Sequence, residues 1–165
     1  MGKIAFVTVG TTKFDALVKA LDTDFVQQAL VAQGFSTLLI QRGKSEHEPK
    51  SRVGNSLDVH VYEYKPSLKP DAESADLIIS HAGAGSVLEA LRLRKTLIVV
   101  ANESLMDNHQ QELAAAMSEQ GWLFTARPDT LASVISEAHA STLRPLEPLN
   151  LIPFKNHVME AMGLL

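Results

Sequence analysis

The sequence has no cysteine, no excess of basic residues and no long run of hydrophobic residues. Without cysteine, the chain has neither a disulfide scaffold nor a thiolate metal site. The longest uninterrupted apolar runs, Leu97–Ala101 and Leu113–Met117, are far shorter than the ~20 residues that a membrane-spanning helix needs. The first residues, MGKIAFVTVG, lack the apolar core and cleavage site of a secretion signal. These absences predict a soluble, cytosolic protein.

The charge balance and the length narrow the class of protein further. The chain has 15 Lys and Arg against 19 Asp and Glu, and its formal net charge of −4 argues against a nucleic-acid partner, because such proteins usually carry a basic face. Its 165 residues fit a single domain of roughly 100–200 residues. A domain of this size buries roughly 70% of the surface that its unfolded chain exposes, so it needs no covalent crosslinks.

Short strand-like segments alternate with helical segments along the chain. The expected strands are Lys3–Val9, Thr37–Gln41, Leu57–Tyr64, Asp76–Ser80, Thr96–Ala101 and Trp122–Thr125. The expected helices are Phe14–Gln33 with a break near 22–24, Gly85–Arg92, Asn108–Gln120, Pro128–His139 and a last one from about Pro153. Apolar strands separated by helices are typical of a parallel sheet covered on both faces. The sequence therefore predicts an α/β fold with a Rossmann-like, doubly wound parallel sheet.

Such sheets bind ligands outside the carboxyl ends of their strands, which directs attention to the turns after Val9, Ser80 and Ala101. The first turn is Gly10-Thr11-Thr12. Gly10 permits a tight turn, and the two hydroxyl groups are expected to face the ligand-binding edge of the sheet. An ordinary connection between a strand and a helix is the alternative interpretation of this tripeptide.

The second turn, HAGAGS at 81–86, has the composition of a phosphate-binding loop. Its small residues allow backbone N–H groups to approach a ligand, and the start of the following helix favours an anion. The third glycine of a dinucleotide fingerprint would fall at Leu88, and no Gly-Lys-Ser/Thr sequence follows. Glu89, one turn into the helix, is positioned to reach back toward a ligand. The alternatives are close packing of the strand and helix for the glycines, and a solvated helix position for Glu89.

The third turn, 102–111, is almost entirely polar although it directly follows a buried strand. Asp107 or Asn108 can cap the next helix, and Gln110 and Gln111 then lie in its first turn. Amide side chains at this place suit a ligand rich in hydroxyl groups. Asp107 and His109 suggest a metal pair, but no third ligand has suitable spacing. Glu103 imitates the ribose-binding acid of an NAD-binding fold, but the glycine loop follows the wrong strand for that class.

Together these segments resemble one family closely. VTVGTT at 7–12, YEYKPSL at 62–68, ADLIISHAGAGSVLEAL at 75–91 and LIVVANESLMDNHQQELA at 97–114 are similar to the soluble subunit of a two-subunit N-acetylglucosaminyltransferase. That enzyme adds the second N-acetylglucosamine to dolichol-diphosphate-linked N-acetylglucosamine, with UDP-N-acetylglucosamine as donor. The HAGAGS…E and NHQ-x-ELA segments also mark the donor-binding half of GT-B glycosyltransferases of family 28, including bacterial two-subunit polysaccharide transferases.

The resemblance implies a donor-binding role for particular positions. The 81–86 loop would bind the diphosphate, and Glu89 would bind the ribose hydroxyls. Tyr64 would stack on the uracil, and the backbone of Lys65 would bind the edge of that base. The side chains of 108–111 would bind the sugar hydroxyls. The implied UDP-N-acetylglucosamine contacts are Gly10, Thr11, Thr12, Tyr64, His81, Gly83, Ala84, Gly85, Ser86, Glu89, Asn108, His109, Gln110 and Gln111. Neither a metal nor another cofactor is implied, because amides and a helix start stabilise the leaving diphosphate.

The resemblance also implies a partner, since an acceptor-binding half is missing from the chain. Residues 1–140 are expected to form the nucleotide-sugar-binding domain. Residues 141–165 are expected to add a proline-rich bend and an amphipathic helix that docks either on the sheet or on a membrane-anchored subunit at the cytosolic face of the endoplasmic reticulum. Inversion at the sugar needs a base, and His81 and His109 are candidates only if this half supplies it. A bacterial-type polysaccharide transferase, a non-catalytic UDP-sugar-binding module and an NAD-dependent oxidoreductase are the alternatives.

Overall fold

A computed structural model describes residues 2–51, 56–102 and 108–138, together with residues 143, 156 and 159–160; at residues 84, 108–110 and 113 it describes the backbone alone. Most of the expected proline-rich bend and C-terminal helix therefore lies outside the described residues. The strands are β1 (Lys3–Thr8), β2 (Phe35–Gln41), β3 (Asp58–Tyr62), β4 (Leu77–His81), β5 (Thr96–Val100) and β6 (Phe124–Ala126). The helices are α1 (Asp15–Leu21), α2 (Asp24–Ala32), α3 (Lys69–Ser74), α4 (Ala84–Arg92), α5 (Asn108–Glu119) and α6 (Leu131–Glu137).

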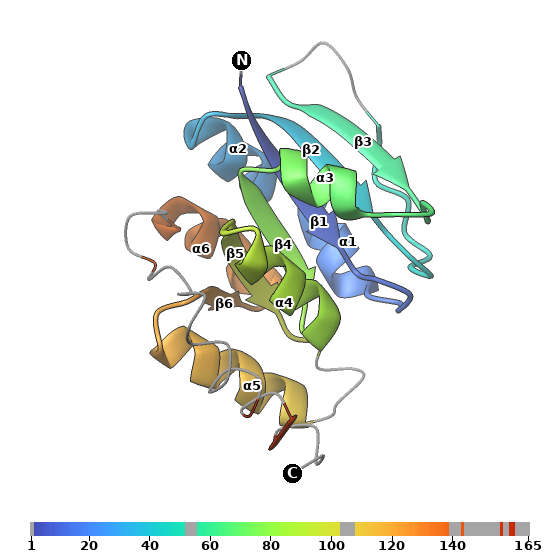
Figure 1. The fold of residues 1–165 in the computed structure, drawn as a ribbon. Helices are drawn as coiled ribbons and strands as arrows, with labels where there is room; N and C mark the ends of the chain where they lie inside the picture. The colour runs from blue at the N-terminus through green and yellow to red at the C-terminus, as the bar shows by residue number, and fades with distance from the viewer. Residues whose placement is uncertain are drawn as a thin grey trace.

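The strands form one sheet in the order β3-β2-β1-β4-β5-β6, and every neighbouring pair is parallel. The carboxyl ends of all strands consequently lie at one edge of the sheet (Figure 1). The chain builds outward from β1 in one direction through β2 and β3, and then in the other through β4, β5 and β6. This reversal makes the gap between β1 and β4 the topological switch point. The predicted doubly wound, Rossmann-like fold is confirmed.

Helices cover both faces of the sheet (Figure 1). Side chains of α1, α2 and α6 share one hydrophobic core with one face, and side chains of α3, α4 and α5 share a second core with the other face. Successive strand residues alternate between the two cores, as the pleat requires. Val7 and Ile79 enter the first core, whereas Phe6 and Ile78 enter the second. Burial on both faces explains why β4 and β5 are continuous apolar runs.

Several element boundaries differ from the sequence predictions. The break expected near 22–24 is present because Thr23 caps α2, its side chain accepting a hydrogen bond from the Val26 amide. The strand expected at Trp122–Thr125 begins two residues later, at Phe124. The helix expected from Pro128 opens with a 3-10 turn over Pro128–Thr130 before α6. Helix α3 was not predicted from the sequence.

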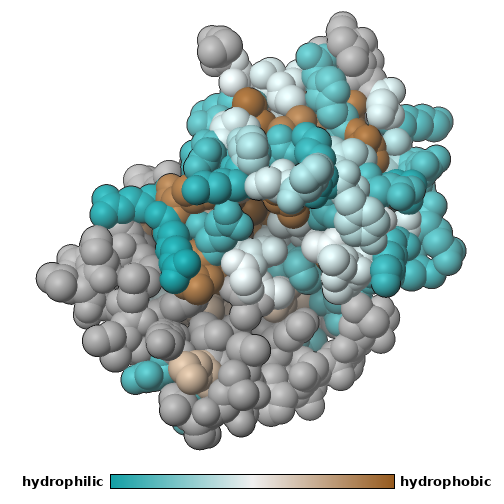
Figure 2. Space-filling view, turned by 45° about the vertical axis from the view of Figure 1, so that its right-hand side comes forward, coloured by the Kyte–Doolittle hydropathy of each residue, from teal (hydrophilic) through white to brown (hydrophobic). Residues whose placement is uncertain are grey.

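Hydrophilic side chains cover much of the described surface on the face shown in Figure 2. On the face shown in Figure 2, hydrophobic side chains of described residues form separate areas between hydrophilic ones. Among the described residues, the large hydrophobic side chains that are exposed are Phe25, Val31 and Tyr64. Within the same part of the chain, no helix combines the length and the apolar character needed to cross a membrane.

Candidate ligand-binding site

The turn after β1 is tight and internally bonded. Gly10 has φ +62°, in the left-handed region that favours glycine. The Thr12 amide and the Thr12 hydroxyl both donate to the Val9 carbonyl, at 3.2 and 2.7 Å. The Thr12 hydroxyl hydrogen is thus used within the turn, whereas Thr11 is exposed at its tip. Of the two hydroxyl groups expected to face a ligand, Thr11 is the better placed donor.

The second turn is shorter than the sequence suggested. Helix α4 begins at Ala84, with Gly83 as its N-cap in an extended conformation and no side chain capping it. Only Ala82 and Gly83 therefore separate β4 from α4, and residues 84–86 belong to the first turn of the helix rather than to a loop. The first amides of a helix have no partner within it. Their N–H groups and the positive end of the helix dipole form an anion-binding position at the switch point.

His81, the last residue of β4, lies between the first two turns. A Cβ atom built on Gly10 would be 3.0 Å from Cε1 of the His81 ring, and one built on Gly83 would be 2.5 Å from its Nε2. The ring Nδ1 is 3.4 Å from the Thr8 carbonyl, which can only accept a hydrogen bond. Burial lowers the pKa of His81, while the Thr8 contact opposes this in part. The ring is therefore neutral at neutral pH and joins the β1 and β4 turns.

The two glycines of this segment have different surroundings. Gly83 has no room for a side chain, because a Cβ would collide with the His81 ring. A Cβ on Gly85, by contrast, would have nothing within 4 Å, and Gly85 is exposed in the first turn of α4. Close packing of strand and helix thus explains Gly83 but does not explain Gly85. Space left open beside helix amides is what an approaching ligand requires.

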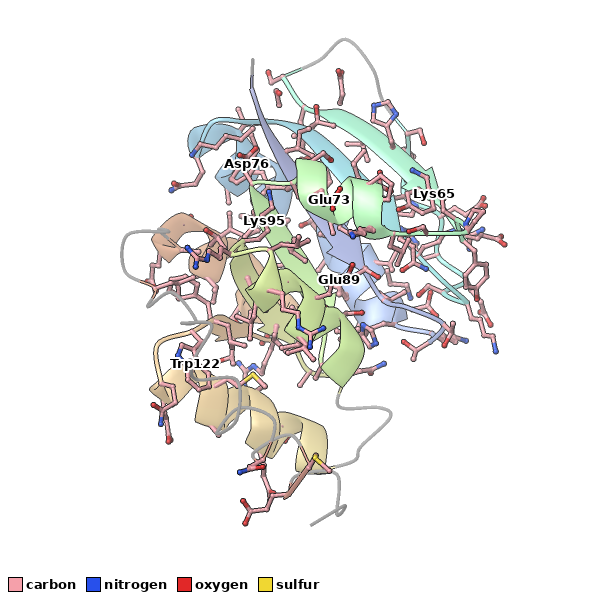
Figure 3. The ribbon with its side chains drawn as sticks, viewed as in Figure 1. Lys65, Glu73, Asp76, Glu89, Lys95 and Trp122 are labelled. Carbon is pink, nitrogen blue, oxygen red and sulfur yellow. The ribbon has the colours of Figure 1, made fainter. Side chains whose placement is uncertain are left out.

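Glu89 is exposed on α4, one turn beyond Gly85. Figure 3 shows it on α4, with Lys65 beyond the end of β3. Tyr64 follows β3 and is 49% exposed, so its ring is accessible to a planar group. The Lys65 ammonium group lies 2.8 Å from the Asp71 carboxylate and 4.2 Å from the centre of the Tyr62 ring. These contacts anchor the 62–65 segment to α3.

Asp71 also accepts a hydrogen bond from the Tyr62 hydroxyl. The pKa of Tyr62 is raised mainly by burial and also by this hydrogen bond to the carboxylate, so its hydroxyl remains protonated. Tyr62 and Leu68 pack against the same core that contains Val87 and Ala90 of α4. The segment around Tyr64 is therefore held at both ends against the core to which α4 contributes.

The third turn is described at its two ends. The side-chain amide of Asn102 donates to the Lys13 carbonyl at 3.0 Å, which ties the end of β5 to the turn after β1. Residues 103–107, with Glu103 and Asp107, lie outside the described residues, and at 108–110 the backbone alone is described. Helix α5 begins at Asn108 as predicted. Gln111 lines a cavity of about 310 Å³ beside the ends of β5 and β6, together with Ala101 and Arg127.

The structure thus brings together the first two turns that the sequence singled out and Asn102, the first residue of the third. Gly10 and Gly83 both lie against the His81 ring, and the hydrogen bond from Asn102 to the Lys13 carbonyl brings the end of β5 next to them. Sequence reasoning missed Gln41, whose buried side chain bonds to the first turn. The available signal was a polar residue at the end of the apolar strand TLLIQ. Within the described ranges, no group of three His, Asp or Glu side chains is placed to hold a metal; the Asp107 and His109 side chains fall outside them.

A doubly wound parallel sheet with glycine-containing turns at its switch point is the architecture of nucleotide-binding α/β domains. The sequence profile of the glycosyltransferase family 28 C-terminal domain matches residues 4–159, and the chain belongs to this family. The resemblance inferred from the motifs is confirmed at this level.

Named relatives agree with the family assignment. UDP-N-acetylglucosamine transferase subunit ALG13 of Mus musculus is 50% identical over 122 residues, which are 74% of this chain and 10% of that protein. The subunit of the same name from Saccharomyces cerevisiae is 34% identical over 178 aligned positions, covering 88% of each chain. The NMR solution structure of ALG13 superposes with a TM-score of 0.74 at 28% identity and covers 97% of this chain and 96% of that one. This chain therefore spans about a tenth of the mouse relative but most of the yeast one.

Proposed function

We propose that this chain is the donor-binding subunit of an N-acetylglucosaminyltransferase. It binds UDP-N-acetylglucosamine and, with a membrane-bound partner, transfers N-acetylglucosamine to N-acetylglucosaminyl-diphosphodolichol with inversion at the anomeric carbon. The observation that carries this proposal is the likeness to the yeast protein named a UDP-N-acetylglucosamine transferase subunit, which extends over 88% of both chains. The open space at Gly85, beside the first-turn amides of α4 at the switch point, supports a diphosphate ligand.

In this proposal the diphosphate of the donor lies at the start of α4. Cleavage of the sugar–phosphate bond leaves negative charge on the diphosphate, and fixed N–H groups aimed at that charge lower the barrier. The first-turn amides of α4 and the exposed Thr11 hydroxyl supply such donors. Glu89 accepts from the ribose hydroxyls, Tyr64 stacks on the uracil, and Gln110 and Gln111 bind the sugar. No residue of this set requires a metal ion.

The acceptor hydroxyl must lose a proton as it attacks, and we propose that the partner subunit supplies the base. His81 is neutral, as a base must be, but its ring is packed between Gly10 and Gly83. This position suits a residue that shapes the turns better than one that reaches an acceptor. The partner would also hold the lipid acceptor and place the chain at the cytosolic face of the endoplasmic reticulum.

A transfer assay tests the proposal. The purified chain is incubated with UDP-N-acetylglucosamine and a dolichol-linked acceptor, alone and with membranes that contain the partner. We expect product only in the second mixture, while the chain alone binds UDP. Robust transfer by the chain alone would refute the two-subunit proposal. UDP binding without transfer in any mixture would favour a non-catalytic binding module, and transfer to a bacterial-type polysaccharide acceptor alone would favour that alternative.

A further inference from the structure

Gln41 ends β2 with a side chain that is only 1% exposed. It is one of few buried polar side chains among the described residues, the others being Thr8, Gln27, Ser45 and Ser80. Burying an amide in a sheet otherwise lined by apolar residues is costly unless all its hydrogen-bonding groups are satisfied. The partners of this side chain therefore indicate why a glutamine occupies the position.

The Gln41 amide makes hydrogen bonds through both of its ends. Its Oε1 accepts from the Thr8 hydroxyl at 2.7 Å, the Val9 amide at 3.2 Å and the Gly10 amide at 3.0 Å. Its Nε2 donates to the Gly10 carbonyl and to the Glu63 carbonyl, both at 2.7 Å. A reversed amide would set its NH2 group against two N–H donors and its oxygen against two carbonyls, so the network fixes its orientation.

These partners lie at or just beyond the carboxyl ends of β1 and β3, the two strands that flank β2. Thr8, Val9 and Gly10 lead into the turn at 10–12, whereas Glu63 immediately precedes Tyr64. The segment that follows β2 also contacts this turn. A Cβ on Gly43 would be 2.7 Å from both the Gly10 and the Thr12 carbonyl oxygens, and the Lys44 amide donates a hydrogen bond to the Thr12 carbonyl. One buried side chain thus joins the segment proposed to contact the diphosphate to the segment proposed to hold the uracil.

We propose that Gln41 is a positioning residue that sets the distance between the diphosphate-binding and uracil-binding segments without touching the donor. This inference rests on the proposed donor-binding function. A ligand that engages both segments, such as UDP, gains affinity from their fixed separation, because the protein does not have to reorganise on binding. A ligand that engages one segment, such as uridine, gains little from it.

The test compares UDP and uridine binding to Gln41→Met by calorimetry or NMR titration. The matched control is Gln27→Met, which removes another buried amide, bonded to the Leu21 carbonyl at 3.0 Å in the helical layer. We expect Gln41→Met to lose UDP affinity by about tenfold and uridine affinity by less than about threefold, with Gln27→Met unchanged for both ligands. Unchanged UDP affinity in folded Gln41→Met, or equal losses for UDP and uridine, would overturn the proposal.

If Gln41→Met does not fold, Thr8→Val is the second variant: it removes the bond from the Thr8 hydroxyl to Gln41 and the bond from the Gly10 amide to that hydroxyl, and it leaves the other Gln41 bonds in place. It is expected to show the same pattern with a smaller loss. A separate measurement needs no ligand. Amide hydrogen exchange should accelerate together at Gly10, whose amide donates to the Gln41 side chain, and at Arg42, whose amide donates to the Tyr62 carbonyl at 2.9 Å, in the Gln41 or Thr8 variant but not in Gln27→Met. Acceleration at neither residue, or at one of them only, would contradict the coupling. Failure of the wild-type chain to bind UDP, with coupled exchange intact, would instead refute the proposed donor binding.

Discussion

The carboxylate of Glu89 is exposed one turn beyond the open position at Gly85. A charged acceptor bonded to ligand hydroxyls is worth ~1.5–3 kcal/mol. We therefore expect Glu89→Ala to weaken UDP binding roughly ten- to hundredfold without unfolding the chain, as measured by calorimetry. Glu137→Ala, at an exposed position of α6 on the other side of the sheet, is the control and should bind UDP normally. Unchanged affinity in folded Glu89→Ala would remove this residue from the site.

The partly buried imidazole of His81 makes the stability of the fold depend on pH. Because burial lowers its pKa below the usual 6.5, the unfolded chain takes up a proton more readily than the folded protein. The contribution of His81 is fully favourable above pH 6.5, and it is lost as the pH falls from there toward the lowered pKa of the folded state. Below that pKa the loss is complete.

Denaturant titrations at several pH values between 7.5 and 5 measure this effect. We expect His81→Gln to lose less stability than the wild type on acidification across this range. The control is His60→Gln, at an exposed position of β3, which should follow the wild-type pH dependence. Parallel curves for His81→Gln and the wild type would contradict a lowered pKa of His81.

At the scale of elements, a substitution at the start of α4 is expected to change the free energy of unfolding and the UDP affinity in opposite directions. Gly85→Ala adds a methyl group in open space within a helix, so the free energy of unfolding should rise by up to about 0.5–1 kcal/mol. If the diphosphate lies there, the same methyl group should weaken UDP binding by about tenfold, the equivalent of one charge-assisted hydrogen bond. Thermal denaturation and calorimetry measure the two quantities on one sample.

Gly83→Ala is the counterpart of this variant, because its methyl group would lie 2.5 Å from the His81 ring. We expect it to lower the melting temperature, whereas Gly85→Ala does not. A stable Gly85→Ala that binds UDP as tightly as the wild type would place the ligand elsewhere.

The sequence predicted strands well where both faces of the strand are buried, and helices well where apolar residues recur with the helical period. The apolar runs of β4 and β5 and the polar residues near 22–24 indicated two strands and a helix break that the structure confirms. Helix α3 escaped prediction because only Ala72 of its residues is buried, and because Pro70, which usually ends a helix, lies at its start, where proline is tolerated. Its six residues show no apolar period to detect.

The candidate site was predictable only in part, for a related reason. The glycine-containing turns could be predicted from their local sequence and from the rule that ligands bind at the switch point of a parallel sheet. The contacts of Gln41 join residues 22 to 33 positions apart, and no local pattern encodes such bonds. The same holds for the Asn102–Lys13 contact between the third and first turns, which are 89 positions apart.

For the whole molecule, the proposed binding mode predicts independence from divalent cations. Amides and a helix terminus would carry the diphosphate charge, which otherwise calls for a metal ion. We expect UDP affinity and transfer activity in the assembled complex to stay within about twofold of their original values after EDTA treatment. Loss of both on chelation, with recovery on addition of Mg²⁺ or Mn²⁺, would count against the proposed arrangement.

The strand order has a consequence for synthesis on the ribosome. Strand β1 is made first, yet it occupies the middle of the sheet, between β2 and β4. When β2 and β3 have joined it, one edge of β1 still exposes unpaired backbone groups between buried side chains such as Phe6 and Val7. Edges of this kind recruit other chains. Pairing of β4 moves this open edge to β4, and pairing of β5 moves it to β5. We therefore expect the nascent chain to remain aggregation-sensitive until Phe124–Ala126 has left the exit tunnel and the short strand β6 covers β5.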